Sequence, residues 1–159
     1  MSAAAPARAT WEDLLAAAEG ERAEVIAGTL HVAPAALPEH AQAAGSLSHL
    51  IGGPFHFDRG GRGGWWILAE VDVRLGPHGI VRPDLSGWRR ERLPSPWGVR
   101  PIDVAPDWAC EIVPPSSARI DRVKKRALYA RAGVAHTWIV DVLARTVEAL
   151  ALAGGTWRD

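Results

Sequence analysis

The sequence predicts a mixed α/β fold of the α+β kind, because helical and strand patterns both occur and hairpins separate the helices. Apolar residues recur at three- and four-residue steps over residues 40–51, as in an amphipathic helix. Apolar residues alternate over residues 65–75, as in a strand with one buried face. The chain of 159 residues can enclose one core, so we expect a single domain over residues 1–159.

Three helices are expected. Thr10 can cap the first, and Gly20 ends it. Gly52-Gly53-Pro54 ends the second, and Gly133 ends the third in the left-handed conformation. The expected bounds are Thr10 to about Ala18, His40 to about Ile51, and Ser116 or Ser117 to about Ala132.

The remaining patterns predict strands joined by short turns. Residues 25–26 and 30–32 flank Ala27-Gly28, which indicates a hairpin. Residues 65–75 are expected to form one strand, and residues 80–85 the antiparallel strand that returns along it. Residues 87–106 are rich in proline and arginine, which predicts a surface loop. Three further strands are expected at 107–113, 136–142 and 145–152.

The composition excludes several functional classes. Lysine and arginine together number 18, as do aspartate and glutamate, so a polyanion partner must be met by a local basic patch. Cys110 is the single cysteine, which excludes an intramolecular disulfide and a cysteine-rich zinc site, and favours the cytoplasm. No apolar run reaches the roughly 20 residues that span a bilayer, so we expect no membrane partner and no signal peptide.

Acidic residues recur on the central strands. Glu70 and Asp72 share one face of the first strand, Asp84 follows Pro83 on its partner, and Glu111 lies on the next strand. Carboxylates from adjacent strands are ligands that Mg²⁺ prefers. Acids on an exposed strand face and an X-Pro-Asp turn are equally ordinary features, and an arginine partner would also explain Glu111. The pattern alone leaves these alternatives open.

Lys125 is ambiguous from its helical position. It points almost opposite an apolar stripe, which predicts a solvated side chain. However, Asp121, Lys125 and Tyr129 form a ladder at four-residue steps, and Leu128 falls off the apolar stripe, as in a helix covered on two sides. The stripe comprises Ile120, Val123, Ala127 and Ala130.

Three segments carry a family likeness: RPDLSGW, PDWACEIVPPSS and DRVKKRALYARAGVAHTWIVD. In this order they resemble the Uma-two family of restriction-endonuclease-like proteins, within the PD-(D/E)XK nuclease superfamily. A weaker likeness extends upstream through residues 23–34 and His40, so it covers most of the chain. The positions that match the family motif are Pro83-Asp84, Glu111-Ile112, Asp121, Lys125, Tyr129, Gly133-Val134 and Trp138.

The resemblance implies a restriction-endonuclease-like core, in which helices flank a central mixed β-sheet. It also implies that Asp84 and Glu111 bind Mg²⁺, with Mn²⁺ as an alternative, and that Lys125 orients or activates the attacking water and stabilises developing charge. The superfamily usually places this lysine two residues after the second acid, where this chain has Val113, so the helical lysine is taken to replace it. The supporting residues implied are Glu70, Asp121 and Tyr129.

The sequence departs from the family pattern in three places. Pro114 stands where the family commonly has serine, and His136-Thr137 replaces an acid followed by tyrosine. The chain stops at GGTWRD, whereas family members usually continue through further strands. The chain is therefore either a shortened member of the family or the product of a clipped gene model, and its domain could lack C-terminal strands.

Three functions fit the sequence. The first is a metal-dependent DNA endonuclease that hydrolyses phosphodiester bonds. Its difficulty is the zero net charge, because duplex binding needs basic side chains near phosphates. A local basic track is one interpretation of five arginines, and an ordinary solvated loop is the other, so the DNA-binding residues stay unknown. The five are Arg59, Arg62, Arg89, Arg90 and Arg92.

The second function is a catalytically silent binding or assembly module that keeps the nuclease fold, as a homo-oligomer. The third is a metal-dependent hydrolase of a small phosphorylated substrate, which needs no basic groove. His40 and His49 could serve a transition-metal version of such a site, although a lone helical histidine is more often structural.

Overall fold

The computed structural model describes residues 7–17, 21–113 and 118–159, and leaves the side chains of residues 118–122 outside the description. Its helices are α1 (Trp11–Ala17), α2 (Pro38–Ile51), the short π-helix η1 (Gly52–His56) and α3 (Ala118–Arg131). Its strands are β1 (Arg22–Ile26), β2 (Thr29–Ala33), β3 (Trp65–Ala69), β4 (Val73–Arg74), β5 (Ile80–Val81), β6 (Leu85–Arg89), β7 (Trp108–Val113), β8 (His136–Asp141), β9 (Thr146–Ala153) and β10 (Thr156–Arg158).

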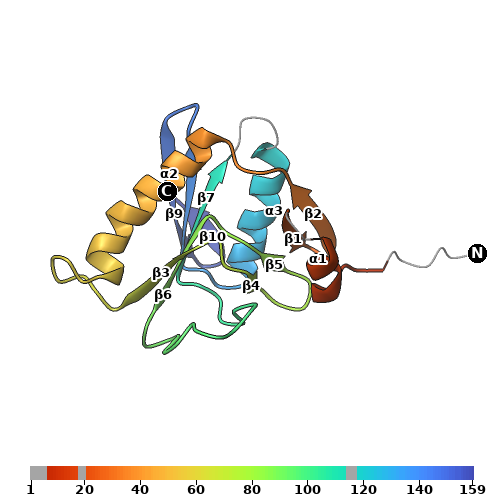
Figure 1. The fold of residues 1–159 in the computed structure, drawn as a ribbon, viewed down its shortest axis with the longest axis horizontal. Coiled ribbons are helices and arrows are strands. Elements are labelled where there is room, and N and C mark those ends of the chain that lie inside the picture. The colour runs from red at the N-terminus through yellow and green to blue at the C-terminus, as the bar shows by residue number, and fades with distance from the viewer. Residues whose placement is uncertain (1–6, 18–20, 114–117) are drawn as a thin grey trace, which may run out of the picture.

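The strands form two sheets (Figure 1). The larger has the order β10-β9-β8-β7-β6-β3, and the smaller has the order β2-β1-β5-β4. Strands β7 and β8 pair in parallel, because α3 connects them as a crossover, while the other pairs of both sheets are antiparallel. The predicted mixed α/β fold is therefore confirmed.

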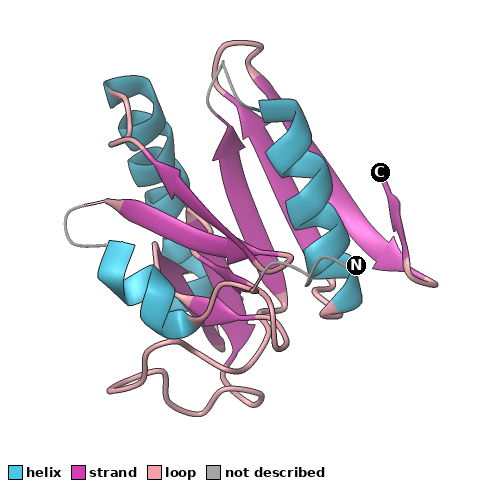
Figure 2. Cartoon of the chain, turned by 90° about the vertical axis from the view of Figure 1, so that its right-hand side faces the viewer, coloured by secondary structure: helices cyan, strands magenta, loops and turns pink. Residues whose placement is uncertain are grey.

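The six-stranded sheet lies between α2 and α3 (Figures 1 and 2). Alternate side chains of β7 point to opposite faces of the sheet, as the period of two requires. Trp108, Cys110 and Ile112 belong to the cluster that packs against α2. Ala109 belongs to the cluster that contains Tyr129 of α3. The same alternation sends Glu111 to the α3 face, where it contacts Tyr129.

The first helix and hairpin match the sequence predictions. Thr10 and Asp13 cap α1 reciprocally, because each backbone N–H donates to the other's side chain, at 2.8 and 3.3 Å. The predicted end at Gly20 lies outside the described residues. Ala27 and Gly28 both have left-handed φ, of 53° and 80°, as a two-residue hairpin turn between β1 and β2 requires.

The α-helix α2 ends at Ile51, as predicted, but Gly52-Gly53-Pro54 does not stop the helical winding of the chain. Gly52 keeps right-handed dihedrals, with φ −59° and ψ −39°, and the chain continues as η1 to His56. In this wider turn the N–H of Phe57 donates to the carbonyl of Gly52 at 3.0 Å. Pro54 is tolerated because it lies inside that turn and its missing N–H is not required for the bond.

The predicted single strand over residues 65–75 is two strands in different sheets. Glu70, with φ 50°, ends β3, and β4 begins only at Val73. The returning strand is divided in the same way, since Pro83 and Asp84 separate β5 from β6. Proline cannot donate to a ladder, so the pairing changes sheet at this point. The predicted antiparallel direction is correct for both halves.

The predicted loop over residues 87–106 begins only after Arg89. Trp88 is fully buried in β6, and its indole N–H donates to the Val104 carbonyl at 2.8 Å. The neighbouring Gly87 is tightly packed: a Cβ atom there would lie 3.1 Å from Ile67 Cδ1. Residues 90–106 do form a loop, which touches the smaller sheet through a bridge between Val73 and Ile102.

The C-terminal half follows the predictions closely. β7, α3, β8 and β9 occupy the expected ranges, and Gly133 ends the α3 region with φ 74°. The proposed caps Ser116 and Ser117 lie outside the described residues. The short strand β10 was not predicted. Within the described ranges, no helix combines the length and apolar character needed to cross a bilayer.

Candidate functional site

Asp84 is the centre of the first half of the site. It lies between β5 and β6 and is only 2% exposed. Its Oδ1 contacts Arg22 Nη1 at 2.7 Å and His40 Nε2 at 3.0 Å, while its Oδ2 accepts the Ile112 backbone N–H at 2.6 Å. Residues from β1, α2 and β7 therefore converge on this one carboxylate.

These partners keep Asp84 ionised. Burial alone would raise its pKa, but the hydrogen bond from His40, the charge of Arg22 and the N–H of Ile112 outweigh burial and lower the pKa below its ordinary value. The hydrogen bond to Asp84 raises the pKa of His40 in return. The pKa of Arg22 is also raised, because Asp84 and nearby glutamates outweigh the cost of its burial.

Glu111 is the centre of the second half. Its Oε2 lies 2.9 Å from Lys125 Nζ, and its Oε1 accepts the hydroxyl hydrogen of Tyr129. Lys125 and Tyr129 are four residues apart on α3, so consecutive turns present them to β7. Burial raises the pKa of Glu111 to about 7 despite the charge of Lys125, and the charge of Asp84 acts in the same direction as burial.

Lys125 is buried within the site. It is 8% exposed, and its Nζ lies between Glu111 Oε2 and Glu24 Oε1, the latter at 2.8 Å. Burial would lower the pKa of Lys125, but Glu111 and Glu24 together raise it above its ordinary value. The side chain is therefore a fixed positive charge at neutral pH, and the solvated position that the sequence left open is not adopted.

Sequence reasoning missed Arg22 and Glu24. Both belong to β1, whose remaining residues are buried, and they stand two positions apart on the same face. Glu24 is only 8% exposed and also accepts the Arg82 backbone N–H at 2.7 Å. The signal that could have identified them is a pair of charged residues two positions apart in an otherwise apolar strand.

The other candidate acids do not join Asp84 and Glu111. Asp72 is buried and paired elsewhere, with Arg82 at 2.8 Å and Arg100 at 2.6 Å. The left-handed residue Glu70 breaks the predicted alternation, so the two acids do not share one strand face. The Glu70 side chain is 59% exposed and lies 3.8 Å from Arg22.

The structure places the four remaining candidates, Tyr129, Asp121, His40 and His49, differently. Tyr129 contacts Glu111 directly. The side chain of Asp121 lies outside the described residues. His49 is exposed further along α2, whereas His40 binds Asp84.

The donor set of the site fits a hard divalent cation. Asp84 and Glu111 offer carboxylate oxygens, and Mg²⁺ commonly takes one or two carboxylates and completes its octahedron with water. Three carboxylates, those of Glu24, Asp84 and Glu111, face the two permanent cations Arg22 and Lys125, and a protonated His40 balances the third carboxylate. Among the described residues, no group of three or more histidine, cysteine or acidic side chains surrounds a common metal position.

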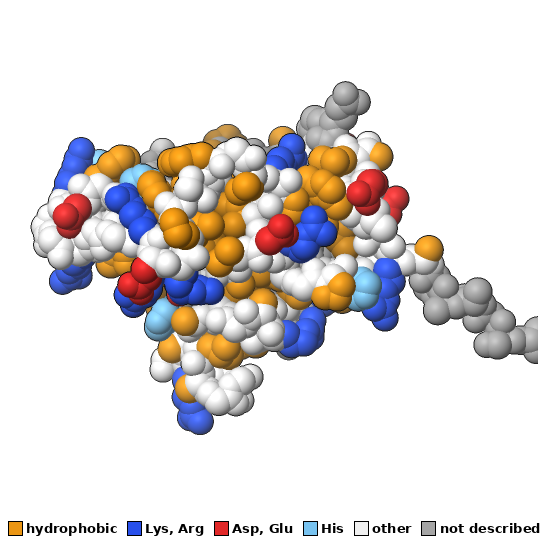
Figure 3. Space-filling model, turned by 90° about the horizontal axis from the view of Figure 1, so that it is seen from below, with side chains coloured by type: hydrophobic (Ala, Val, Ile, Leu, Met, Phe, Trp, Pro, Cys, Tyr) orange, Lys and Arg blue, Asp and Glu red, His pale blue; other side chains and the backbone are white. Residues whose placement is uncertain are grey.

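The five candidate DNA-binding arginines are all exposed. Three of them rest on aromatic rings, with Arg90 closest, 4.2 Å from the centroid of Trp66. Arg92 is paired with Asp107 at 2.7 Å. On the face shown in Figure 3, basic side chains lie singly or in small groups, separated by apolar and acidic ones.

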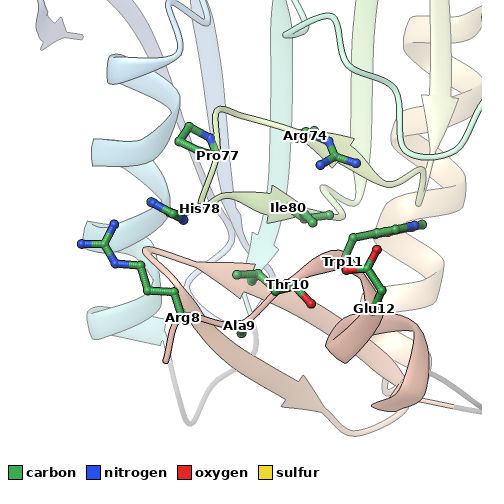
Figure 4. A pocket seen from close by; sticks show the side chains of 10 residues that line it. Arg8, Ala9, Thr10, Trp11, Glu12, Arg74, Pro77, His78 and Ile80 are labelled. Atoms are coloured by element: carbon green, nitrogen blue, oxygen red, sulfur yellow. The ribbon is translucent and has the colours of Figure 1, made fainter. Parts of the chain in front are cut away.

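A surface pocket of about 250 Å³ lies apart from the carboxylates, between α1 and the β4–β5 turn (Figure 4). Arg8 and His78 lie at one end of it, and Arg74 and Trp11 at the other. In the described part of the chain, no residue that lines this pocket forms a hydrogen bond or ion pair with Asp84, Glu111 or Lys125. We therefore place the candidate site at the buried carboxylates.

Comparison with known proteins agrees with this architecture. A protein-family profile described as "Uma2: Putative restriction endonuclease" matches residues 11–159. A crystal structure of "a putative nuclease belonging to DUF820" from Anabaena variabilis has 22% sequence identity and a TM-score of 0.67, and the match covers 81% of this chain and 71% of that chain. A comparison with curated proteins gave no match. The fold is thus the expected restriction-endonuclease-like core, and the chain belongs to the Uma2 family.

Proposed function

We propose that this protein is a metal-dependent DNA endonuclease that hydrolyses phosphodiester bonds at Asp84, Glu111 and Lys125. The observation that carries the proposal is the burial of Lys125 against Glu111, whose pKa is also raised by the charge of the buried Asp84 carboxylate. Burying a lysine and three carboxylates is costly for a domain of this size, and such clusters are typical of functional sites.

Asp84 and Glu111 would hold the Mg²⁺ or Mn²⁺ ion, which when bound supplies Lewis-acid polarisation of a phosphoryl oxygen and lowers the pKa of water. Arg22 and His40 hold the Asp84 side chain in place through Oδ1. Tyr129 holds Glu111 by donating its hydroxyl hydrogen to Oε1. Both carboxylates are thus oriented before any substrate arrives.

Lys125 would act as a charge and not as a base. Its pKa is raised by Glu111 and Glu24, so the free amine is scarce at neutral pH. The ammonium group can orient a water molecule and stabilise the negative charge that develops on the phosphate. Abstraction of the water proton by Lys125 does not fit this charge state.

A plasmid-nicking assay tests the proposal. Wild-type protein with Mg²⁺ or Mn²⁺ should convert supercoiled plasmid to open circles, and Asp84→Asn and Lys125→Met should each lower the rate at least about 100-fold. Lys124→Met is the matched control, because Lys124 is the exposed neighbour on the same helix. If the wild-type protein cleaves plasmid with neither Mg²⁺ nor Mn²⁺, the proposed endonuclease function is refuted.

A second candidate is a silent nuclease-fold module, which binds or assembles without catalysis and forms homo-oligomers. It is favoured by one observation: every carboxylate oxygen of Asp84 and Glu111 already contacts a donor of the protein. A stable dimer by analytical ultracentrifugation, together with no nicking and no Mn²⁺ binding, would support it. Cleavage of bis(p-nitrophenyl) phosphate without plasmid nicking would instead indicate a small phosphorylated substrate.

A further inference from the structure

A second surface pocket, of about 430 Å³, opens beside the candidate site. Glu70 lines it and donates its backbone N–H to the Asp84 carbonyl at 3.3 Å. Arg82 also lines it, and its backbone is bound from the site side, by Glu24 at the N–H and by Arg22 at the carbonyl. The pocket and the buried carboxylates therefore share one wall.

Trp97 gives this pocket an open aromatic surface. Its ring meets Trp66 edge to face, with centroids 5.4 Å apart and planes at 71°. Trp66 is itself fixed, because its indole N–H donates to the Leu93 carbonyl at 2.8 Å and Arg90 covers its ring. Trp97 is nevertheless 64% exposed, so its ring is supported without being covered. The other apolar walls are Leu68, Val71, Pro96, Val99 and Ile102.

The charged groups of the pocket largely cancel. Asp72 is paired with both Arg82 and Arg100, and each arginine reaches it through Nε. The terminal guanidinium nitrogens lie outside these two contacts and can donate to a ligand, while the Glu70 carboxylate can accept. A phosphate would face two carboxylates here, whereas a flat neutral ring with polar edges matches both the aromatic wall and the donors.

We propose that this pocket binds an unpaired nucleobase of the strand presented to Asp84 and Glu111, stacked on Trp97. This inference rests on the proposed function: when a DNA phosphodiester lies at Asp84 and Glu111, a nucleobase of the same strand is the flat ring that can reach the pocket. Stacking on an aromatic side chain tolerates any base, so the subsite recognises unpaired strand structure and not sequence. Single-stranded, nicked or frayed DNA is then bound more tightly than intact duplex.

Binding is measured by fluorescence anisotropy in EDTA, so that cleavage cannot occur. The probes are a short fluorescein-labelled single strand, its duplex, and the same strand with abasic sugars. Trp97→Ala should weaken single-strand binding roughly 5- to 100-fold, as loss of one stacking contact predicts, and Trp97→Phe should restore most of it. The duplex and the abasic strand should respond little. Phe57→Ala is the aromatic control, since Phe57 is 67% exposed and lies outside the pocket.

Several results would overturn the subsite: no measurable single-strand binding, an equal loss for Trp97→Ala on the abasic strand, or an equal loss for Phe57→Ala. Circular dichroism and thermal melting of each variant distinguish these results from misfolding. Base-dependent binding through Trp97 without plasmid nicking would refute the endonuclease and leave the subsite standing. Nicking by wild-type protein with no effect of Trp97→Ala on binding would support the endonuclease and refute the subsite.

Discussion

Lys125 Nζ lies 2.9 Å from Glu111 Oε2 in the interior of the protein, with Glu24 Oε1 on its other side at 2.8 Å. One ammonium group therefore joins β1, β7 and α3. A buried ion pair contributes little to stability relative to apolar residues, but removing one partner leaves an uncompensated charge. The contact of Lys125 with the two glutamates can therefore be tested by measurements of stability, without an assay of catalysis.

Replacing Lys125 by methionine should lower the free energy of unfolding by about 3–5 kcal/mol, because Glu111 and Glu24 lose their shared cation. Urea denaturation followed by circular dichroism measures the change. Lys124→Met should change it by less than about 0.5 kcal/mol, since Lys124 is exposed. Equal stabilities of the two variants would show that Lys125 is solvated.

Glu111 should give the stability a pH dependence that Glu111→Gln lacks. The pKa of Glu111 is about 7 in the folded protein, mainly through burial, against an ordinary 4.5. The folded state therefore binds a proton that the unfolded chain has released, and stability falls as the pH rises through this window. Relative to Glu111→Gln, the wild type should lose roughly 2–3 kcal/mol between pH 5 and pH 7.5. Parallel stability curves for the two proteins would contradict the assignment.

Glu24 should position Lys125 in the proposed reaction. Glu24→Gln removes one of the two carboxylates beside Nζ but keeps a side chain of the same shape, so we expect the nicking rate to fall about 10- to 100-fold while KM for DNA changes little. Glu21→Gln changes an exposed acid just before the same strand and should leave the rate unaltered. A changed KM with an unchanged kcat would place Glu24 in DNA binding.

Gly87 should be required for packing between β3 and β7. A Cβ atom there would lie 3.1 Å from Ile67 Cδ1 and 3.2 Å from the Trp108 ring, so Gly87→Ala should cost about 1–3 kcal/mol. Gly45→Ala is the opposite case, because a Cβ on this α2 residue meets nothing within 4 Å. It should stabilise the protein by up to about 1 kcal/mol. Thermal melting of both variants compares them directly.

Local patterns predicted the elements that depend on neighbouring residues. The cap at Thr10, the Ala27-Gly28 turn and the left-handed Gly133 each need only a few adjacent residues. The four-residue spacing of Lys125 and Tyr129 likewise placed both side chains on one helix face. The spacing did not predict whether this helix face lies in solvent or in the core, because residues four positions apart form the same ladder in both.

Long-range contacts decided the rest. The alternation over residues 65–75 predicts which side chains are buried, but not the sheet in which each residue pairs. The change of sheet at Glu70 could therefore not be predicted from it. The π-helix η1, which contains Pro54, was missed for a related reason, since a π-helical turn has no distinct local signature in this chain.

The sequence by itself determined the α/β class, most of the elements and the acids Asp84 and Glu111 as candidates. Only the tertiary structure decided their surroundings: Arg22 reaches Asp84 across 62 residues, and Glu24 reaches Lys125 from another strand. The physical reason is that a buried charge must be compensated in space, and its partner can come from any part of the chain that folding brings within a few ångströms.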